Sequence, residues 1–212
     1  VYIREAMNPD WASRNLTNGA HAQLDAKRGG CVAYYPFVHT FGAILPLEKY
    51  WDTHPEYYSE INGKRTRDHT QLCMSNPEVV KLATGVVLGW MKDHPEAKIY
   101  SVSHNDWYNN CQCATCRAID EEEGSPSGLL LRFVNAIAAE TSKVYPDKLV
   151  DTLAYQWTEK PPKITKPHPN VRVRLCPIFC CEAHPYETCD AKQNKEFMEN
   201  LKAWSQITDQ LY

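Results

Sequence analysis

The sequence has 212 residues, of which 43% are hydrophobic, and a formal net charge of −3. These values describe a globular chain that can bury a large core, and the near-neutral charge gives no electrostatic basis for binding nucleic acid. No run approaches the roughly 18 consecutive apolar residues that a membrane-spanning helix needs. We therefore expect a globular domain with neither a nucleic-acid partner nor a membrane span.

Apolar, β-branched runs alternate with helical patterns along the chain. We expect strands at residues 1–4, 32–38, 99–102, 149–155 and 171–175, and helices at residues 8–18, 75–91, 127–144 and 194–204. Strands that alternate with helices pair in parallel through right-handed crossovers. This order predicts an α/β fold, with either an open sheet or a barrel that lacks its final units.

Residues 40–73 form a long irregular segment between the second expected strand and the first long helix. Loops of this length inside a compact domain are usually functional. The pair Asn62-Gly63 predicts a tight turn within it. Arg65 follows that turn and is a candidate contact for an anionic sugar such as a uronic acid.

Polar side chains follow the expected strands where each strand ends. The carboxyl ends of parallel strands meet at one edge of a sheet, which is where α/β proteins gather their functional groups. Asp106 and Glu182 are candidate carboxylates at this edge, and we expect desolvation beside the neighbouring aromatic rings to favour the protonated form of Asp106. An imidazole, an amide and aromatic rings suit the hydroxyls and apolar face of a pyranose, and they follow strands at His39, Tyr155, Gln156 and Trp157.

Each of these residues also has a structural alternative. Asp106 is equally suited to capping the loop that follows it, as aspartate often does. Glu182 can be a loop residue paired with a nearby cation, and His39 a hydrogen-bonded structural histidine. The aromatic residues at 155 and 157 can pack beneath the Pro161-Pro162 loop.

Three cysteines, Cys111, Cys113 and Cys116, lie within six residues. This spacing can supply three thiolates to a tetrahedral structural zinc, with Cys73, Cys189 or His104 as the fourth ligand. In an oxidising compartment, two of the three can instead form a disulfide, and the later cysteines Cys176, Cys180, Cys181 and Cys189 can pair with one another. Free buried thiols are the third alternative.

Five segments of the chain are distinctive: HTFGAILPLEKYWDTHPEYYSEINGKR, QLCMSNPEVV, SVSHNDWYNNCQCATCRAIDEEEGSPSG, DTLAYQWTEKPP and RLCPIFCCEAHP. Together they resemble the barrel domain known as domain of unknown function 4838, which occurs mainly in secreted proteins of polysaccharide-degrading bacteria. The resemblance runs from about residue 2 to residue 204 and implies a (β/α) barrel of the glycoside hydrolase type. More distantly, the order of motifs resembles family 20 hexosaminidases, in which the fourth strand ends in Asp-Glu. Asn105 and Asp106 stand at those two positions here, so Asp106 takes the place of the general acid.

We therefore expect one glycosidase-like domain over residues 1–212, folded as a partial or complete TIM-type barrel with about five to six parallel strands. The resemblance implies a bacterial protein that is secreted, periplasmic or on the cell surface, and we expect further domains to flank this one. Asp106 as acid and Glu182 as its partner would cleave a poly- or oligosaccharide without a cofactor. The expected sugar contacts are His39, Arg65, Asn105, Trp107, Tyr155, Gln156 and Trp157.

Two other functions fit the same residues. A carbohydrate-binding barrel without turnover would use the same strand ends to hold a glycan by stacking and hydrogen bonds. A zinc-stabilised interaction module would depend on the cysteines rather than on the carboxylates.

Overall fold

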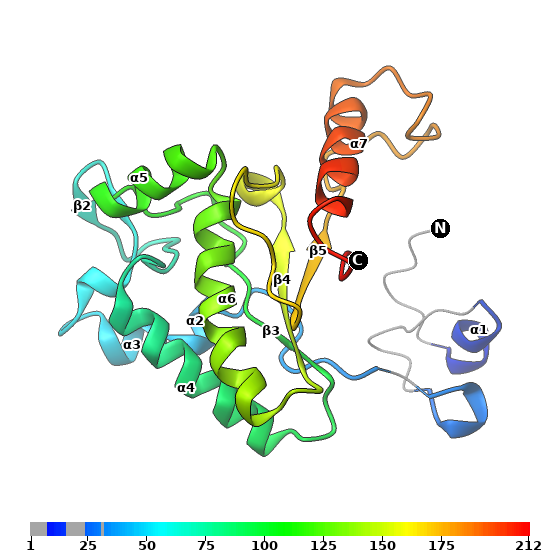
Figure 1. Ribbon diagram of the computed structural model, residues 1–212, viewed down its shortest axis with the longest axis horizontal. Coiled ribbons are helices and arrows are strands. Elements are labelled where there is room, and N and C mark those ends of the chain that lie inside the picture. The colour runs from blue at the N-terminus through cyan, green and yellow to red at the C-terminus, as the bar shows by residue number, and fades with distance from the viewer. Residues whose placement is uncertain (1–7, 16–23, 31) are drawn as a thin grey trace.

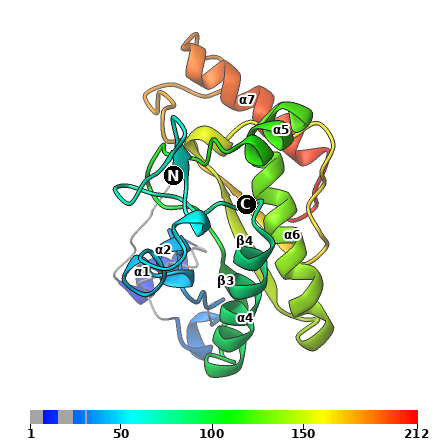
Figure 2. The ribbon, with the colours of Figure 1, turned by 90° about the vertical axis from the view of Figure 1, so that its left-hand side faces the viewer.

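A parallel sheet forms the centre of the computed structural model, which describes residues 8–15, 24–30 and 32–212 (Figure 1). The sheet has the order β3 (Ile99–Ser101), β4 (Leu149–Ala154) and β5 (Val171–Leu175). Helix α4 (Pro77–Asp93) leads into β3, and α6 (Ser127–Val144) connects β3 to β4. Turned by 90°, the molecule shows α4 and α6 side by side against one face of the sheet (Figure 2).

Short parallel contacts extend the sheet at both edges. Tyr34 bridges Ile99, and the backbone N–H of Tyr35 donates to the Ile99 carbonyl over 2.9 Å. At the other edge Leu211 bridges Val173, and the Tyr212 N–H donates to the Val173 carbonyl over 2.8 Å. Segments distant in the sequence therefore flank the three strands.

The expected partial or complete TIM-type barrel is wrong, although the α/β class is confirmed. The described residues form three parallel strands and a separate antiparallel pair, with no closed barrel. Residues 32–38 contribute only the bridge at Tyr34 instead of a full strand, and the strand expected at residues 1–4 lies outside the described part. A barrel closes only when every strand pairs on both sides, so the two sheet edges, each with a single isolated bridge, leave the sheet open.

The remaining elements lie around this sheet. The antiparallel pair is β1 (Glu60–Ile61) and β2 (Lys64–Arg65), joined by the predicted turn, in which Asn62 and Gly63 both have positive φ, 51° and 76°. The shorter helices are α1 (Pro9–Arg14), α2 (Phe41–Ile44), α3 (Leu47–Tyr50), α5 (Ala114–Glu123) and α7 (Lys192–Ser205), with 3₁₀ turns at Ala26–Arg28, Pro55–Tyr57 and Gln156–Thr158. Within the described ranges, no helix combines the length and apolar character needed to cross a membrane.

The two long helices form because their apolar residues share one face. In α4, the Asn76 side chain caps the first turn by accepting from the Glu78 N–H, and Pro77 occupies the first turn, where no N–H is needed. Its fully buried residues recur every fourth position, at Val79, Ala83, Val87 and Met91. In α6 the buried set includes Leu130, Phe133, Val134 and Ile137.

Side chains of β4 and β5 alternate between the two faces of the sheet, as in any strand. Val150, Ala154 and Val173 belong to the core that the helices cover. The opposite face carries Asp151 and Arg174, which form a buried ion pair of 2.5 Å. The charged residues of these strands thus lie on the face away from the helices.

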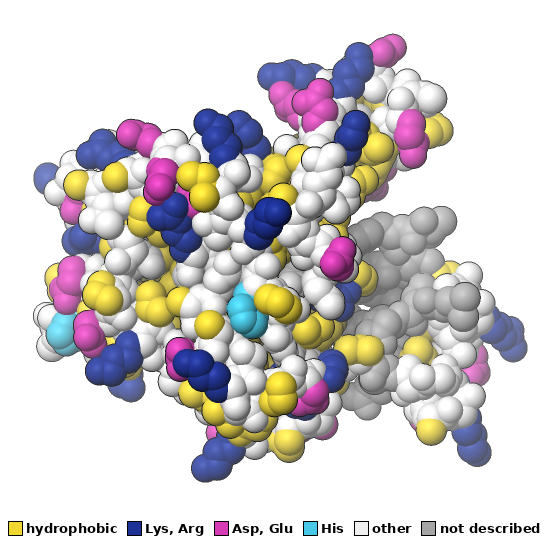
Figure 3. All heavy atoms as spheres, in the orientation of Figure 1, with side chains coloured by type: hydrophobic (Ala, Val, Ile, Leu, Met, Phe, Trp, Pro, Cys, Tyr) yellow, Lys and Arg dark blue, Asp and Glu magenta, His cyan; other side chains and the backbone are white. Residues whose placement is uncertain are grey.

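Charged side chains do not gather into a single patch on the face shown in Figure 3. Acidic and basic groups are interspersed over it, as the small net charge of −3 suggests. This distribution provides no broad electropositive surface on that face.

Candidate functional site

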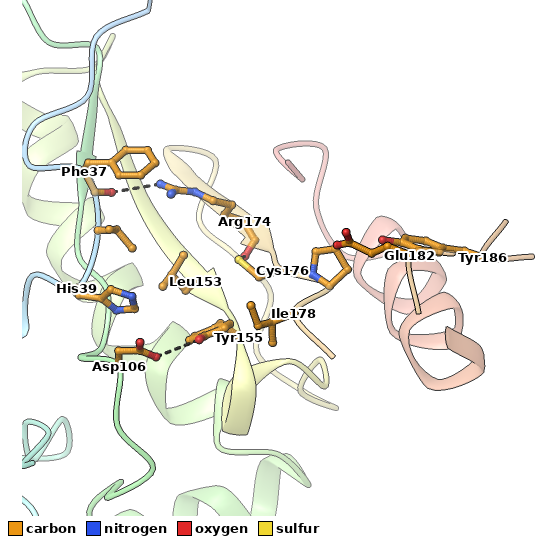
Figure 4. A pocket seen from close by; sticks show the side chains of 12 residues that line it. Phe37, His39, Asp106, Leu153, Tyr155, Arg174, Cys176, Ile178, Glu182 and Tyr186 are labelled. Atoms are coloured by element: carbon orange, nitrogen blue, oxygen red, sulfur yellow. Dashed lines mark hydrogen bonds between the residues drawn. The ribbon is translucent and has the colours of Figure 1, made fainter. Parts of the chain in front are cut away.

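A pocket of about 310 Å³ opens beyond the carboxyl ends of the parallel strands. This is the edge at which α/β proteins place their ligands. Its wall is formed by the segments that follow the Tyr34 bridge, β3 and β4, together with the loop after β5 (Figure 4). The polar and aromatic side chains that line it include His39, Asp106, Tyr155, Arg174, Glu182 and Tyr186.

Asp106 is held at the pocket by two donors from the end of β4. The Tyr155 hydroxyl and the Gln156 Nε2 each donate to Asp106 Oδ1 over 3.0 Å. Burial, reinforced by the adjacent Asp106 carboxylate, raises the pKa of Tyr155 to about 12, so its phenol keeps its proton and remains a donor. The three side chains therefore form one hydrogen-bonded unit on one wall.

The desolvation expected at Asp106 is not found. The residue is exposed, and its two side-chain hydrogen bonds are both accepted by Oδ1. The aromatic neighbours on its C-terminal side, Trp107 and Tyr108, are also exposed, at 42% and 60%. The local chain thus presents a carboxylate beside two accessible rings.

His39 is hydrogen-bonded within the fold and also lines the pocket. Its Nδ1 donates to the His104 carbonyl over 2.8 Å, which fixes the ring and assigns the proton to Nδ1, so that Nε2 is an acceptor in the neutral ring. The residue also lines the pocket, toward which its ring lies in Figure 4. Both His39 and Gln156 adopt positive φ, 55° and 53°, which non-glycine residues adopt at a cost and which often marks functional sites.

Glu182 reaches the pocket from the loop between β5 and α7. Figure 4 shows Glu182 beside Tyr186 and across the pocket from Asp106, with Cys176 and Ile178 between the two sides. The structure thus brings the two predicted carboxylates to one pocket but places them on opposite walls.

The sequence analysis did not identify the charged pair Arg174 and Asp151, of which Arg174 lines the pocket. Arg174 Nη2 donates to Asp151 Oδ2 over 2.5 Å and to the Phe37 carbonyl over 3.3 Å, and its guanidinium lies 4.6 Å from the Phe37 ring centroid. Burial raises the pKa of Asp151 to about 6, although Arg174 opposes this shift. Asp151 Oδ1 and Arg174 Nε have no hydrogen-bond partner. The sequence did contain a signal for this pair, because β4 and β5 each carry charged residues among mostly apolar ones.

Five of the seven predicted sugar contacts lie outside the pocket lining: Arg65, Asn105, Trp107, Gln156 and Trp157. Asn105 is tied into the fold, because its side chain donates to the Thr70 carbonyl over 3.0 Å and accepts from the Gly42 N–H over 3.2 Å. The Trp157 Nε1 donates to the Trp107 carbonyl over 3.0 Å, which joins the loops after β3 and β4. These hydrogen bonds engage Asn105 and Trp157 within the fold.

A second site is formed by four cysteines, Cys73, Cys111, Cys113 and Cys116. Their sulfur atoms all lie within 4.8 Å of one another. Cys73 Sγ is 3.8 Å from Cys113 Sγ and 3.9 Å from Cys116 Sγ, close to the ~3.8 Å between sulfurs that Zn–S bonds of about 2.3 Å give in a tetrahedron. No disulfide joins these four cysteines. The cluster could therefore hold a metal ion.

Donors and a cation surround these sulfurs. The Glu60 N–H donates to Cys111 Sγ over 3.4 Å, and Arg65 donates to the same sulfur over 3.7 Å. Hydrogen bonds from Cys111 and Cys116, with a smaller one from Arg65, lower the pKa of Cys73. Arg65, predicted to contact sugar, therefore lies at the cysteine cluster and stabilises negative charge there.

Cys73 is the fourth member of the cluster, and the two other candidates lie elsewhere. His104 is fully buried, with Nε2 3.2 Å from the Thr158 hydroxyl, and burial lowers its pKa to about 4. Cys189 lies in the loop after β5. Cys73 precedes α4, whereas Cys111 lies just before α5, Cys113 is its N-cap and Cys116 lies in its first turn, so the cluster joins two parts of the chain.

The fold and site define an α/β protein with an open parallel sheet and a pocket at its carboxyl edge. Within that class, the chain belongs to the family described as domain of unknown function 4838 (DUF4838), whose model matches residues 2–212. This match confirms the resemblance to that domain family, which the sequence segments indicated. No curated protein matches the chain.

Proposed function

We propose that the pocket binds a poly- or oligosaccharide and hydrolyses a glycosidic bond, as part of a secreted or cell-surface protein. The observation that carries this proposal is the presence of Asp106 and Glu182 on opposite walls of one pocket. Glycoside hydrolysis needs one carboxylic acid to protonate the leaving oxygen and a second carboxylate to act as base or nucleophile. Asp106 takes the role of acid and Glu182 that of its partner.

The remaining wall residues suit a sugar. His39 offers an acceptor at Nε2 once its Nδ1 is bound, and the Tyr155 hydroxyl is held beside Asp106. A volume of about 310 Å³ lies at the lower end of the range for small-ligand sites. The pocket thus suits a single terminal sugar ring rather than a long stretch of polymer.

Glycan binding without turnover is the second candidate, and the exposure of Asp106 favours it. An exposed carboxylate held by two donors is suited to accept hydrogen bonds from sugar hydroxyls. Trp107 is 42% exposed beside it, and an accessible indole face is a surface on which a pyranose stacks.

Hydrolysis of a panel of aryl glycosides and polysaccharides by the full-length protein tests the first candidate. We expect Asp106→Asn and Glu182→Gln each to reduce product release at least 100-fold, while Asp93→Asn, at the far end of α4, leaves it unchanged. Glycan binding by isothermal calorimetry, with no product from any substrate, would contradict hydrolysis and support the binding role.

We also propose that the four-cysteine cluster binds a structural zinc ion. Four thiolates in tetrahedral spacing are a typical structural zinc site, and such sites stabilise folding directly. The metal would tie the segment before α4 to the start of α5. Metal analysis of the purified chain is expected to find one zinc ion per chain at this cluster that is lost in Cys111→Ser.

A further inference from the structure

A second group of metal-ligand atoms lies in the loop between β5 and α7. Cys181 Sγ is 3.3 Å from His184 Nδ1, and Cys189 Sγ is 3.9 Å from the same nitrogen. The three ligand atoms all lie within 4.8 Å of one another. They converge from a stretch that contains no helix or strand between Leu175 and Lys192, all of which the structure describes.

These separations fit a tetrahedral metal ion. Zn–S bonds of about 2.3 Å and Zn–N bonds of about 2.0–2.1 Å place sulfur and nitrogen ~3.6 Å apart at the tetrahedral angle. The two observed separations, 3.3 and 3.9 Å, lie on either side of that value. Thiolate and imidazole are the ligands that zinc and similar soft divalent ions prefer.

Contacts with α7 hold the ligand loop in this arrangement. The Asn194 side chain, which is fully buried, accepts from the Cys181 N–H over 2.7 Å and donates to the Cys181 carbonyl over 3.0 Å. Tyr186 packs edge-on against Phe197 with ring centroids 5.6 Å apart. Cys189 is itself only 8% exposed. The backbone on both sides of His184 is therefore positioned by the helix.

We propose that Cys181, His184 and Cys189 form a second metal site, for a divalent cation of the zinc class. The two thiols each release a proton on binding, and the two thiolates with a neutral imidazole balance the charge of the ion. Water completes the tetrahedron. Glu182 lies between the first two ligands in the sequence and lines the pocket, so the metal also fixes the backbone of that pocket wall.

Metal content per chain tests this site independently of any activity on sugars. Full-length protein saturated with Zn²⁺ and then desalted is expected to lose one bound metal per chain in His184→Ala and in Cys181→Ser. Cys176→Ser, which changes a thiol of the same loop outside the three-ligand group, is expected to lose none. Combining His184→Ala with Cys111→Ser should remove two, because the two clusters share no ligand.

Cobalt substitution gives a second measurement that does not depend on the number of metal ions bound per chain. Reconstitution of the Cys111→Ser protein with Co²⁺ should give thiolate-to-cobalt charge-transfer absorption that disappears in Cys111→Ser with His184→Ala. Circular dichroism verifies that both proteins are folded. The proposal is overturned if His184→Ala binds as much metal as the unaltered chain, or if mass spectrometry of the native protein finds a Cys181–Cys189 disulfide.

Discussion

The side chain of Glu123 occupies the space into which a Cβ atom at Gly128 would project. Gly128 lies in the first turn of α6, so the helix can approach the end of α5 only because this residue has no side chain. The two helices meet at one buried carboxylate and one glycine.

Substitution of Gly128 by alanine is expected to destabilise the protein by about 2–3 kcal/mol, because the new methyl group must displace a buried, hydrogen-bonded side chain. Gly85 lies within α4 with nothing within 4 Å of its Cβ direction. Gly85→Ala is therefore the matched control, and its higher helix propensity should stabilise the protein by about 0.5–1 kcal/mol. Urea unfolding of the two variants measures both effects, and equal stabilities would contradict the close approach.

Glu123→Gln is expected to cost about 2–4 kcal/mol at pH 7. The Glu123 carboxylate accepts from the Thr165 N–H over 3.0 Å and from Arg132 Nε over 2.8 Å, and an amide would turn one acceptor into a donor facing these donors. Glu122 also pairs with Arg132, but its side chain is 54% exposed, so Glu122→Gln should change stability by less than about 0.5 kcal/mol.

The contribution of Glu123 to the free energy of unfolding should also depend on pH. Burial raises the pKa of Glu123, but the hydrogen bonds from Thr165 and Arg132 outweigh this effect and hold the pKa below its ordinary value of 4.5. Its stabilisation is therefore fully present above pH 4.5 and is lost as the pH falls through the lowered pKa. Unfolding free energies of the wild type and Glu123→Gln should converge on acidification, and a constant difference between pH 7 and pH 3 would argue against this.

Asp120→Asn is expected to have the opposite effect. Burial raises the pKa of Asp120 from 3.8 to about 6, and its Oδ1 has no hydrogen-bond partner. Above pH 6 the folded state holds a penalised charge that an amide removes, so the variant should be more stable by about 1 kcal/mol at pH 8. Below pH 3.8 the Asp120 carboxyl is protonated and neutral in both the folded and the unfolded chain. The stability gained in Asp120→Asn should therefore decrease as the pH falls from 6 toward that value.

Glu121→Gln serves as the control for Asp120, since it changes an exposed carboxylate on the same helix. It should alter stability little at either pH. Thermal unfolding at pH 8 and pH 4 would measure the difference, and a destabilised Asp120→Asn at pH 8 would show that the carboxylate has a partner in solution.

The elements with strong periodicity were predictable from the sequence. The apolar faces of α4 and α6 and the short apolar runs of β3, β4 and β5 locate them to within a few residues. Helix α5 was not among the expected helices, because it is short and its sequence, ATCRAIDEEE, is mostly polar. The strand expected at residues 32–38 formed only a bridge, because strand pairing depends on tertiary neighbours that local pattern does not specify.

The site was predictable where it follows strand ends and unpredictable where it depends on distant contacts. His39, Asp106, Tyr155 and Glu182 all line the pocket. Cys73 could be named only as one of three fourth ligands, since its position depends on how residues 40–73 fold back. Arg65 faces the cysteines for the same reason.

Arg65→Gln is expected to weaken zinc binding at the four-cysteine cluster by about 10- to 100-fold, the usual cost of losing an outer contact to a ligand. The guanidinium donates to Cys111 Sγ over 3.7 Å and to the Tyr58 carbonyl over 2.6 Å, so its loss removes both charge and anchoring. Arg67→Gln, at an exposed position two residues away, is the matched control. Competition with a chromophoric chelator measures both affinities, and equal values would exclude a role for Arg65.

Removal of the Arg174 cation is expected to be the most costly single change. Arg174→Met leaves the fully buried Asp151 without its ion-pair partner and should reduce stability by about 3–5 kcal/mol at pH 8. Because Arg174 lowers the Asp151 pKa from the value that burial alone would give, the pKa in the variant should exceed about 6. Protonation of Asp151 then relieves the penalty of the unpaired charge, so the loss of stability should be smaller at pH 5 than at pH 8.

Asp151→Leu with Arg174→Met replaces both charges by apolar groups and should recover most of the stability. Chemical unfolding of the single and double variants at both pH values tests this, and a double variant no more stable than Arg174→Met would show that the unpaired charge is not the cause.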